Sequence, residues 1–176
     1  MSTTTSHRRA PVAAALVAVA LAAAPAHGAS APPSAVCTNT FTASITPGFT
    51  TRPGAGKLSS NGQTGSIECF GTIGGQRVTG PGTLGFVEHH KSGSCRGHTG
   101  TGRVHLVIPT TAGSKDMVGR LAVRRTGLMV RVTVRFPGVF YSGNGVVFPR
   151  LGDCTSTPLE QIRVTMTGSL RDTGRR

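Results

Sequence analysis

The 176-residue chain contains no tryptophan, one tyrosine and only six acidic side chains. Proteins that bind single-stranded nucleic acid stack bases on exposed aromatic rings, so this composition disfavours that class, and no specific nucleic-acid partner is expected. Glycoside hydrolases need a matched pair of carboxylates. Here the candidates for such a pair are few: Glu68, Glu88, Asp116, Asp153, Glu160 and Asp172.

Several catalytic and cofactor motifs are also missing. The sequence has no G-x-S-x-G nucleophile elbow, no glycine-rich phosphate loop followed by Lys-Ser/Thr, and no C-x-x-C pair. Hydrolysis by a serine nucleophile and nucleotide binding through a phosphate loop are therefore disfavoured. We expect no cofactor and no metal, and the motifs single out no catalytic residue.

The first 28 residues have the three parts of a secretory signal peptide. Arg8 and Arg9 precede an apolar run that ends at Ala24, and small residues follow up to Gly28. This run falls short of the roughly 20 apolar residues that a spanning helix needs, which disfavours the alternative of an uncleaved anchor. We predict a secreted, extracellular protein that is cleaved after Gly28 and has no transmembrane segment in its mature chain.

The mature chain predicts one domain with short flanking segments. Residues 29–36 are small, polar or proline and predict a linker at the mature N-terminus. Residues 37–170 have the length of a single domain. We expect residues 171–176 to be a basic, disordered tail.

Four cysteines follow the predicted cleavage site: Cys37, Cys69, Cys95 and Cys154. An even number of cysteines in an exported protein favours two disulfides, whereas a zinc site would usually bring its ligands in close pairs. Three connectivities are possible. We favour Cys69–Cys95 with Cys37–Cys154, because the first pair would join neighbouring segments and the second would tie the first segment to the last.

The chain is strongly basic. Its formal net charge is +13, and removal of Arg8 and Arg9 with the signal peptide leaves 17 basic and 6 acidic side chains, a net charge of +11. Such an excess favours anionic partners, which include nucleic acid, acidic polysaccharide and phosphate-bearing envelope polymer.

Apolar residues alternate with polar ones in short segments throughout the mature chain. This pattern, with many Gly and Thr residues between and within the segments, predicts eight or nine β-strands and no helical crossover. We predict an all-β fold, an antiparallel β-barrel of about eight strands, with a β-sandwich as the alternative. The expected strands are 41–45, 65–73, 77–87, 103–108, 116–124, 127–136, 138–141, 146–148 and 162–170.

Part of the pattern resembles a family of small exported bacterial proteins that have no assigned activity. The resemblance rests on Cys37, the segment F41-x-A-x-I-T-P-G48, the segment G65-x-I-x-C69-x-G71-x-I73, T79-G-P-G82, Cys95, and G152-D-C154 followed by Pro158 and Leu159. It implies export and a single β domain, and it implies no chemistry. Size and glycine-rich strands are also similar, more distantly, to the barrels of the allene oxide cyclase and dirigent group.

Histidines gather between residues 89 and 105. His89 and His90 are adjacent, so in a strand they point to opposite faces. His98 lies in the segment S92-G-S-C-R-G-H-T-G100, which we interpret as a solvated loop. A hydrolase or isomerase that uses Glu68, Glu88 and His105 stays an alternative, which requires these three side chains to meet in one concave site.

Residues 117–136 predict a hairpin with one basic and one apolar face. With Thr126-Gly127 as a two-residue loop, Val123 faces Val130. A loop of two or four residues keeps the valines on one face of the hairpin and the arginines on the other, whereas a loop of three residues would mix them. Arg125 is assigned to the turn. The basic face holds Arg120, Arg124, Arg131 and Arg135, and the apolar face holds Met117, Leu121, Val123, Val130, Val132, Val134 and Phe136. We expect the apolar face inside.

The favoured function is a non-catalytic binding module for anionic envelope or extracellular polymer, with the four arginines as the anion-binding residues. A barrel that holds a small ligand is an alternative. If the arginines lined the interior instead, they would form a site for a small anion.

Overall fold

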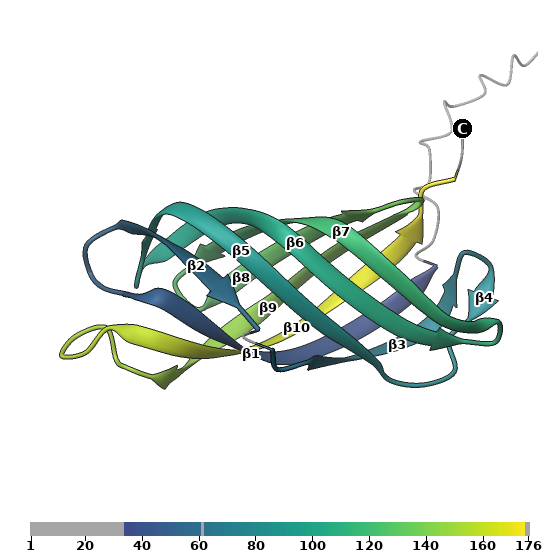
Figure 1. Cartoon of the computed structure of the whole chain (residues 1–176), viewed down its shortest axis with the longest axis horizontal. Helices are drawn as coiled ribbons and strands as arrows, with labels where there is room; N and C mark the ends of the chain where they lie inside the picture. The colour runs from purple at the N-terminus through teal and green to yellow at the C-terminus, as the bar shows by residue number, and fades with distance from the viewer. Residues whose placement is uncertain (1–33, 61, 175–176) are drawn as a thin grey trace, which may run out of the picture. The chain divides into compact units, whose positions relative to one another are not determined.

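A computed structural model describes residues 34–60 and 62–174, which form ten β-strands (Figure 1). The predicted signal peptide lies outside the described residues. Within the described part of the chain, no helix could cross a membrane. The strands are β1 Ala35–Phe49, β2 Gly54–Ser59, β3 Gly65–Ile73, β4 Gln76–Arg77, β5 Gly82–Ser94, β6 Gly97–Thr110, β7 Gly113–Thr126, β8 Met129–Phe136, β9 Val139–Leu151 and β10 Leu159–Asp172.

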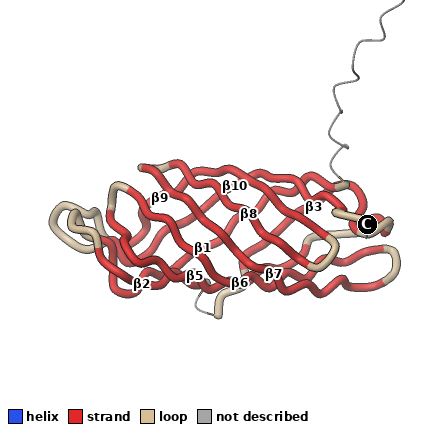
Figure 2. The backbone as a smooth tube through the Cα atoms, turned by 90° about the horizontal axis from the view of Figure 1, so that it is seen from above, coloured by secondary structure: helices blue, strands red, loops and turns tan. Residues whose placement is uncertain are grey.

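Pairing of β1 with β10 closes the sheet. The two strands pair from Ala35 opposite Leu170 to Ser44 opposite Gln161, and β5 to β10 follow one another as antiparallel hairpins. β2 and β3 each join β1 to β5, at opposite ends of the ring. The result is a closed ring of eight strands with its loops at the two ends (Figure 2). The predicted all-β, antiparallel fold of about eight strands is confirmed, and the sandwich alternative is not.

Strand alternation divides the ring into an inside and an outside. Along β8, for example, Val130, Val132 and Val134 are buried while Arg131 and Arg135 are exposed. Every long strand contributes aliphatic side chains to one continuous core. Apolar burial of this kind stabilises by about 25 cal/mol per Å² of apolar surface removed from water, which makes the interior the main source of stability.

The expected strands differ from the observed ones in several places. The expected strand 77–87 is divided, because β4 ends at Arg77 and β5 begins at Gly82. β2 was not expected, because its sequence G-A-G-K-L-S has one large apolar residue. The two segments 138–141 and 146–148 form the single strand β9, since Gly143 pairs with Gly168 and the two glycines leave room for the buried ring of Tyr141. The first and last strands also extend to Ala35 and Asp172, into the predicted linker and tail.

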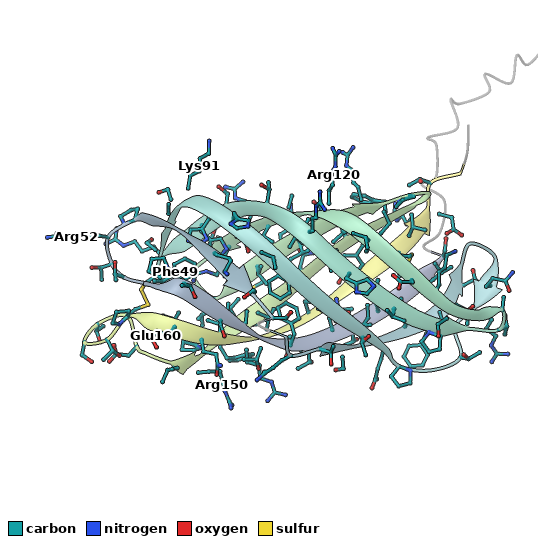
Figure 3. The ribbon with its side chains drawn as sticks, in the orientation of Figure 1. Phe49, Arg52, Lys91, Arg120, Arg150 and Glu160 are labelled. Atoms are coloured by element: carbon teal, nitrogen blue, oxygen red, sulfur yellow. A yellow bond between two sulfur atoms is a disulfide. The ribbon has the colours of Figure 1, made fainter. Side chains whose placement is uncertain are left out.

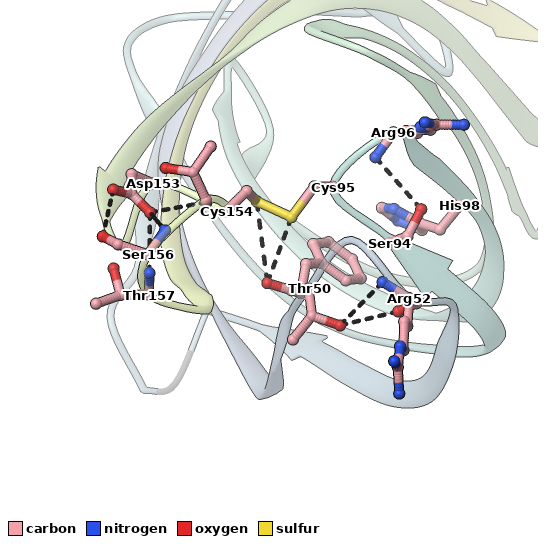
Figure 4. The surroundings of a disulfide bond; sticks show 12 residues. Thr50, Arg52, Ser94, Cys95, Arg96, His98, Asp153, Cys154, Ser156 and Thr157 are labelled. Carbon is pink, nitrogen blue, oxygen red and sulfur yellow. Dashed lines mark hydrogen bonds between the residues drawn. A yellow bond between two sulfur atoms is a disulfide. The ribbon is translucent and has the colours of Figure 1, made fainter.

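The two disulfides are Cys37–Cys69 and Cys95–Cys154, so the predicted connectivity was wrong. Cys37 lies directly opposite Cys69 in the β1–β3 pairing, with 4.1 Å between their Cα atoms. Cys95 lies in the β5–β6 turn at the other end of the ring, beside the loop between β9 and β10 that holds Cys154 (Figure 4). Hydrogen bonding of β1 to β10 already ties the first strand to the last, so closure of the ring needs no disulfide.

We expect this connectivity to appear in peptide mapping of the oxidised protein. Proteolysis without reduction should release one disulfide-linked pair with Cys37 and Cys69, and one with Cys95 and Cys154. The double variant Cys95→Ser/Cys154→Ser should lose about 2–5 kcal/mol of unfolding free energy in urea, because it frees a long loop in the unfolded chain. Recovery of a Cys37–Cys154 peptide would contradict the assignment.

Candidate functional site: a basic outer face and a buried polar cluster

The β7–β8 hairpin presents its arginines to solvent. Arg120 pairs with Arg135 and Arg124 with Arg131, and all four side chains are exposed. The valines and leucine between them point into the core. The predicted orientation, aliphatic side chains inside and arginines outside, is confirmed, and the four predicted residues share one outer surface. Figure 3 shows Arg120 pointing away from the ring.

The hairpin loop is Gly127-Leu128 and not Thr126-Gly127. Thr126 pairs with Met129, so Val123 faces Val132 instead of Val130. Gly127 has φ +56°, which suits the first central position of a two-residue type II′ turn, where glycine is favoured. Both loops contain two residues, and a shift of the register by two keeps each side chain on its predicted face. The faces were therefore right although the pairing was wrong.

β6 adds Arg103 to this surface. Arg103 pairs with Arg120, which pairs in turn with Arg135, so three arginines form a row across three neighbouring strands. Neighbouring strands lie about 4.8 Å apart. Like charges that face each other directly are destabilising in a sheet. The sequence signal for Arg103 was its alternation with Val104 and Leu106, but only the β6–β7 register places it beside Arg120.

A shallow depression lies over this row. It has a volume of about 930 Å³, and Arg103, Arg120 and Arg135 line it. Its floor contains the small residues Thr101, Ala122 and Thr133, which pair in the next row across β6, β7 and β8. Arg124 and Arg131 pair in the row beyond this floor and do not line the depression. The basic outer face is thus two rows of arginine with small side chains between them. We call the five residues the arginine face: Arg103, Arg120, Arg124, Arg131 and Arg135.

Carboxylates do not neutralise the arginine face. His105, at the edge of the depression, holds Asp116 with 2.7 Å between Nε2 and Oδ1. Arg131 donates from Nε to Oδ1 of Asn144 at 3.1 Å. Within the part of the chain that the structure describes, none of the five arginines forms an ion pair with a carboxylate. The face therefore has an excess of cationic groups, and a bound anion would reduce the repulsion between them.

A second polar cluster is buried inside the ring. Glu88, His90, His98 and Arg125 have exposed fractions of 1%, 5%, 6% and 5%. Alternation along β5 puts Glu88 and His90 on the same inner face as Leu84. Gly100 lacks a side chain where the Glu88 carboxylate lies, which makes room for it. The prediction of a solvated loop around His98 was wrong, because β6 begins at Gly97 and continues the inner face.

Arg125 organises this cluster, so its assignment to the turn was also wrong. Its Nε donates to Nδ1 of His98 at 3.3 Å, and its Nη1 donates to the carbonyls of Cys95 and Gly127 at 3.2 and 2.8 Å. Its Nη2 donates to the carbonyl of Ser94. The guanidinium lies 4.9 Å above the ring centre of Phe49. Arg125 thereby fastens the β5–β6 turn to the β7–β8 turn from within.

These contacts fix the proton on His98. A guanidinium can only donate, so Nδ1 of His98 accepts and its ring proton lies on Nε2. Nε2 donates to Oε2 of Glu88 at 3.4 Å and also lies 3.1 Å from Oε1, so the donors run from Arg125 through His98 to the carboxylate. The buried negative charge of Glu88 is thereby balanced by the buried positive charge of Arg125.

His90 completes the cluster without a hydrogen bond of its own. Its Nδ1 is buried and unpaired, 3.9 Å from Oε1 of Glu88. Burial lowers the pKa of His90, and the nearby His98 lowers it further, while Glu88 acts in the opposite direction. The ring packs 5.1 Å from Phe49 and 5.3 Å from His98, between ring centres. Burial and the neighbouring His98 thus disfavour the protonated form of His90.

The residues of the predicted enzyme alternative do not meet. Glu68 and His105 are exposed on the outside, and Glu88 is buried inside. In the described chain, no group of three histidine, cysteine or acidic residues is placed to hold a metal ion. The internal cavity has a volume of about 80 Å³, well below the roughly 300–1,000 Å³ of drug-sized ligand sites. The outer depression is therefore the better candidate for a binding site.

Comparison of the chain with protein-family models, with characterised proteins and with solved structures gives no match. The resemblance to a family of small exported proteins stays a prediction.

We expect stability to fall with pH below about 6.5. The unfolded state binds a proton on His90 below its ordinary pKa of about 6.5, whereas the folded state resists it because the folded pKa is lowered. The unfolding free energy in urea should therefore decrease from pH 7.5 to pH 5. His90→Gln should flatten this dependence relative to His89→Gln, an exposed neighbour. Equal slopes in the two variants would contradict the argument.

Loss of Arg125 should be far more damaging than loss of its neighbour. Arg125→Met leaves the Glu88 charge buried and three carbonyls without their donor, which should cost about 3–5 kcal/mol of unfolding free energy. Arg124→Met removes the same charge from the exposed face and should change stability by about 0.5 kcal/mol or less. Urea unfolding of both variants, with their disulfides formed, measures the difference. A similar loss of unfolding free energy in the two variants would refute the role of Arg125.

Proposed function

We propose that this protein is an exported, non-catalytic binding module that holds an anionic polymer on its arginine face. The observation that supports the proposal is the depression of about 930 Å³ whose lining includes Arg103, Arg120 and Arg135, none with a carboxylate partner in the described chain. Cationic side chains gathered at a concave surface raise the local concentration of an anion and strengthen its binding. The partner we propose is envelope or extracellular polymer that bears phosphate, sulfate or carboxylate groups.

A polymer suits the surface better than a single small anion. The two arginine rows extend over β6, β7 and β8, with a floor of small residues between them. One small anion could contact only part of this array, whereas a chain with repeated charges could lie along the floor and reach both rows. Each contact with an exposed arginine is weak, about 0.2–1 kcal/mol, so useful affinity needs several of them together.

Nucleic acid is a less suitable polymer for this face. Bases need exposed aromatic rings to stack on, and the lining has one phenylalanine, Phe86, beside the imidazoles of His89 and His105. The ring of Phe86 packs inward against Phe41, with 5.1 Å between ring centres in an edge-to-face arrangement. The depression therefore offers mainly charge and small side chains, which favour contacts with a charged backbone over stacking with bases.

Export is part of the same proposal. The signal-peptide pattern of residues 1–28 and the pairing of all four cysteines in disulfides support an oxidising compartment outside the cytoplasm. A secreted protein with this charge would meet anionic envelope and extracellular polymers there.

The test is retention on immobilised heparin, a defined polyanion, with the chain that begins at Ala29. Arg103→Gln/Arg120→Gln/Arg135→Gln should weaken binding about tenfold at 0.1 M salt, because three lost contacts of about 0.5 kcal/mol each add to about 1.5 kcal/mol. Unmodified protein should elute as salt screens the contacts.

A matched control separates the face from net charge. Arg52→Gln/Arg77→Gln/Arg150→Gln removes three exposed arginines that lie outside the depression, and Figure 3 shows Arg150 on the side of the ring away from Arg120. This control should bind heparin within about twofold of the unmodified protein. If both triple variants lose affinity equally, binding follows total charge and the proposed site is wrong.

A further inference from the structure

A patch of exposed apolar side chains lies at the end of the ring where β8 begins. Leu128, Met129, Phe148 and Leu151 have exposed fractions of 56%, 58%, 49% and 55%, and Val146 is half-buried. Met129 pairs with Val146, and the amide of Val147 donates to the carbonyl of Leu128 at 2.8 Å. Phe148 and Leu151 continue the patch along β9. We call these five residues the apolar tip.

The position of Leu128 is unusual for an apolar side chain. Central positions of two-residue turns usually hold Gly, Asn, Asp or Ser, because these residues suit the backbone and contact water. Leu128 follows Gly127 in such a turn and is more than half exposed, next to an equally exposed methionine. Contiguous exposed apolar surface marks a site of contact with a protein or a membrane.

Arginines border the tip. Arg131 follows Met129 by two residues on the same outer face, and Arg124 pairs with Arg131. Arg163 pairs with Phe148, and Arg150 lies between Phe148 and Leu151. These four arginines are exposed, and none forms an ion pair within the described residues.

Two exposed carboxylates lie at the same end of the ring. Asp153 in the β9–β10 loop is occupied by its own turn, accepting from the amides of Thr155, Ser156 and Thr157 (Figure 4). Glu160 is exposed at the start of β10. Four arginines therefore outnumber the one carboxylate that is available near the tip, so its border is cationic.

We propose that the apolar tip docks on a membrane surface rich in anionic lipids. Leu128, Met129 and Phe148 would enter the boundary between headgroups and acyl chains, while the bordering arginines contact lipid phosphates. An apolar centre with cationic residues around it binds such surfaces through the sum of apolar burial and attraction to anionic lipid. A peptide or protein segment would favour a groove, and none of the five tip residues lines the outer depression or the internal cavity.

This proposal does not depend on polymer binding. Arg124 and Arg131 belong to the arginine face and also border the tip, but the depression is lined by Arg103, Arg120 and Arg135, which do not border it. The triple variant of these three arginines should therefore bind lipid vesicles normally, and a variant of the tip should bind heparin normally. Failure of one proposal leaves the other to be judged by its own experiment.

The experiment is co-sedimentation with vesicles at 0.1 M salt, using the chain that begins at Ala29. We expect at least tenfold stronger partitioning to phosphatidylglycerol–phosphatidylcholine vesicles than to phosphatidylcholine alone. Leu128→Ser/Phe148→Ser should reduce partitioning about tenfold. The matched control Val36→Ser/Phe70→Ser removes one aliphatic and one phenylalanine side chain from an exposed pair on β1 and β3 and should have no effect. Equal losses in the two double variants, or none in the first, would overturn the proposal.

Absence of tryptophan from the sequence supplies a second readout. Leu128→Trp should show a blue shift of its emission with anionic vesicles, whereas Phe70→Trp should not. Gel filtration tests the competing occupant, a second copy of the chain. If Leu128→Ser/Phe148→Ser dissociates an oligomer and leaves vesicle binding unchanged, the tip is a self-association surface and the membrane proposal is wrong.

Discussion

Pairing of β1 with β10 is the constraint on which the rest of the structure depends. It closes the sheet, so each ring strand has a hydrogen-bonded neighbour on both sides over at least part of its length. Closure also converts strand alternation into an inside and an outside. An apolar residue at one position and an arginine at the next, as in β8, are then separated into core and solvent without any further contact. Both the arginine face and the buried cluster are consequences of this separation.

One end of the interior is polar, and its side chains hold the turns at that end of the ring in place. Arg125 donates to carbonyls of the β5–β6 and β7–β8 turns, and the Cys95–Cys154 disulfide fastens the first of these turns to the β9–β10 loop. A buried arginine requires a negative partner, and Glu88 supplies it through His98. Such an arrangement contributes less stability than a well-packed apolar core would, but its hydrogen bonds fix the positions of two turns, and the disulfide fixes the β9–β10 loop. Leu128 in the apolar tip sits on one of these turns.

Charge is distributed unevenly over the outside of the ring. The outward residues of β1 and β10 include opposed threonine pairs, Thr38 with Thr167 and Thr40 with Thr165, and β1 holds no charged residue. The arginine face is on β6, β7 and β8. An even distribution of the arginines over the outside of the ring would have favoured solubility alone. Because five arginines gather on β6, β7 and β8, this side of the ring is a positively charged surface. The proposed contact with anionic polymer depends on that surface.

Local pattern determined much of this molecule. Alternation in residues 117–136 identified the four outer arginines and the aliphatic core face, because a side chain's face depends only on whether its position is odd or even in the strand, and the shift from a Thr126-Gly127 to a Gly127-Leu128 loop left that unchanged. Disulfide formation likewise followed from the number of cysteines, and export stays a prediction from the N-terminal segment. Long-range pairing was decided only by the tertiary structure. Cys37 meets Cys69 because β3 lies beside β1, Arg103 meets Arg120 through the β6–β7 register, and Arg125, His98 and Glu88 come from three strands. Their meeting depends on how the ring closes, and no short stretch of sequence contains that information.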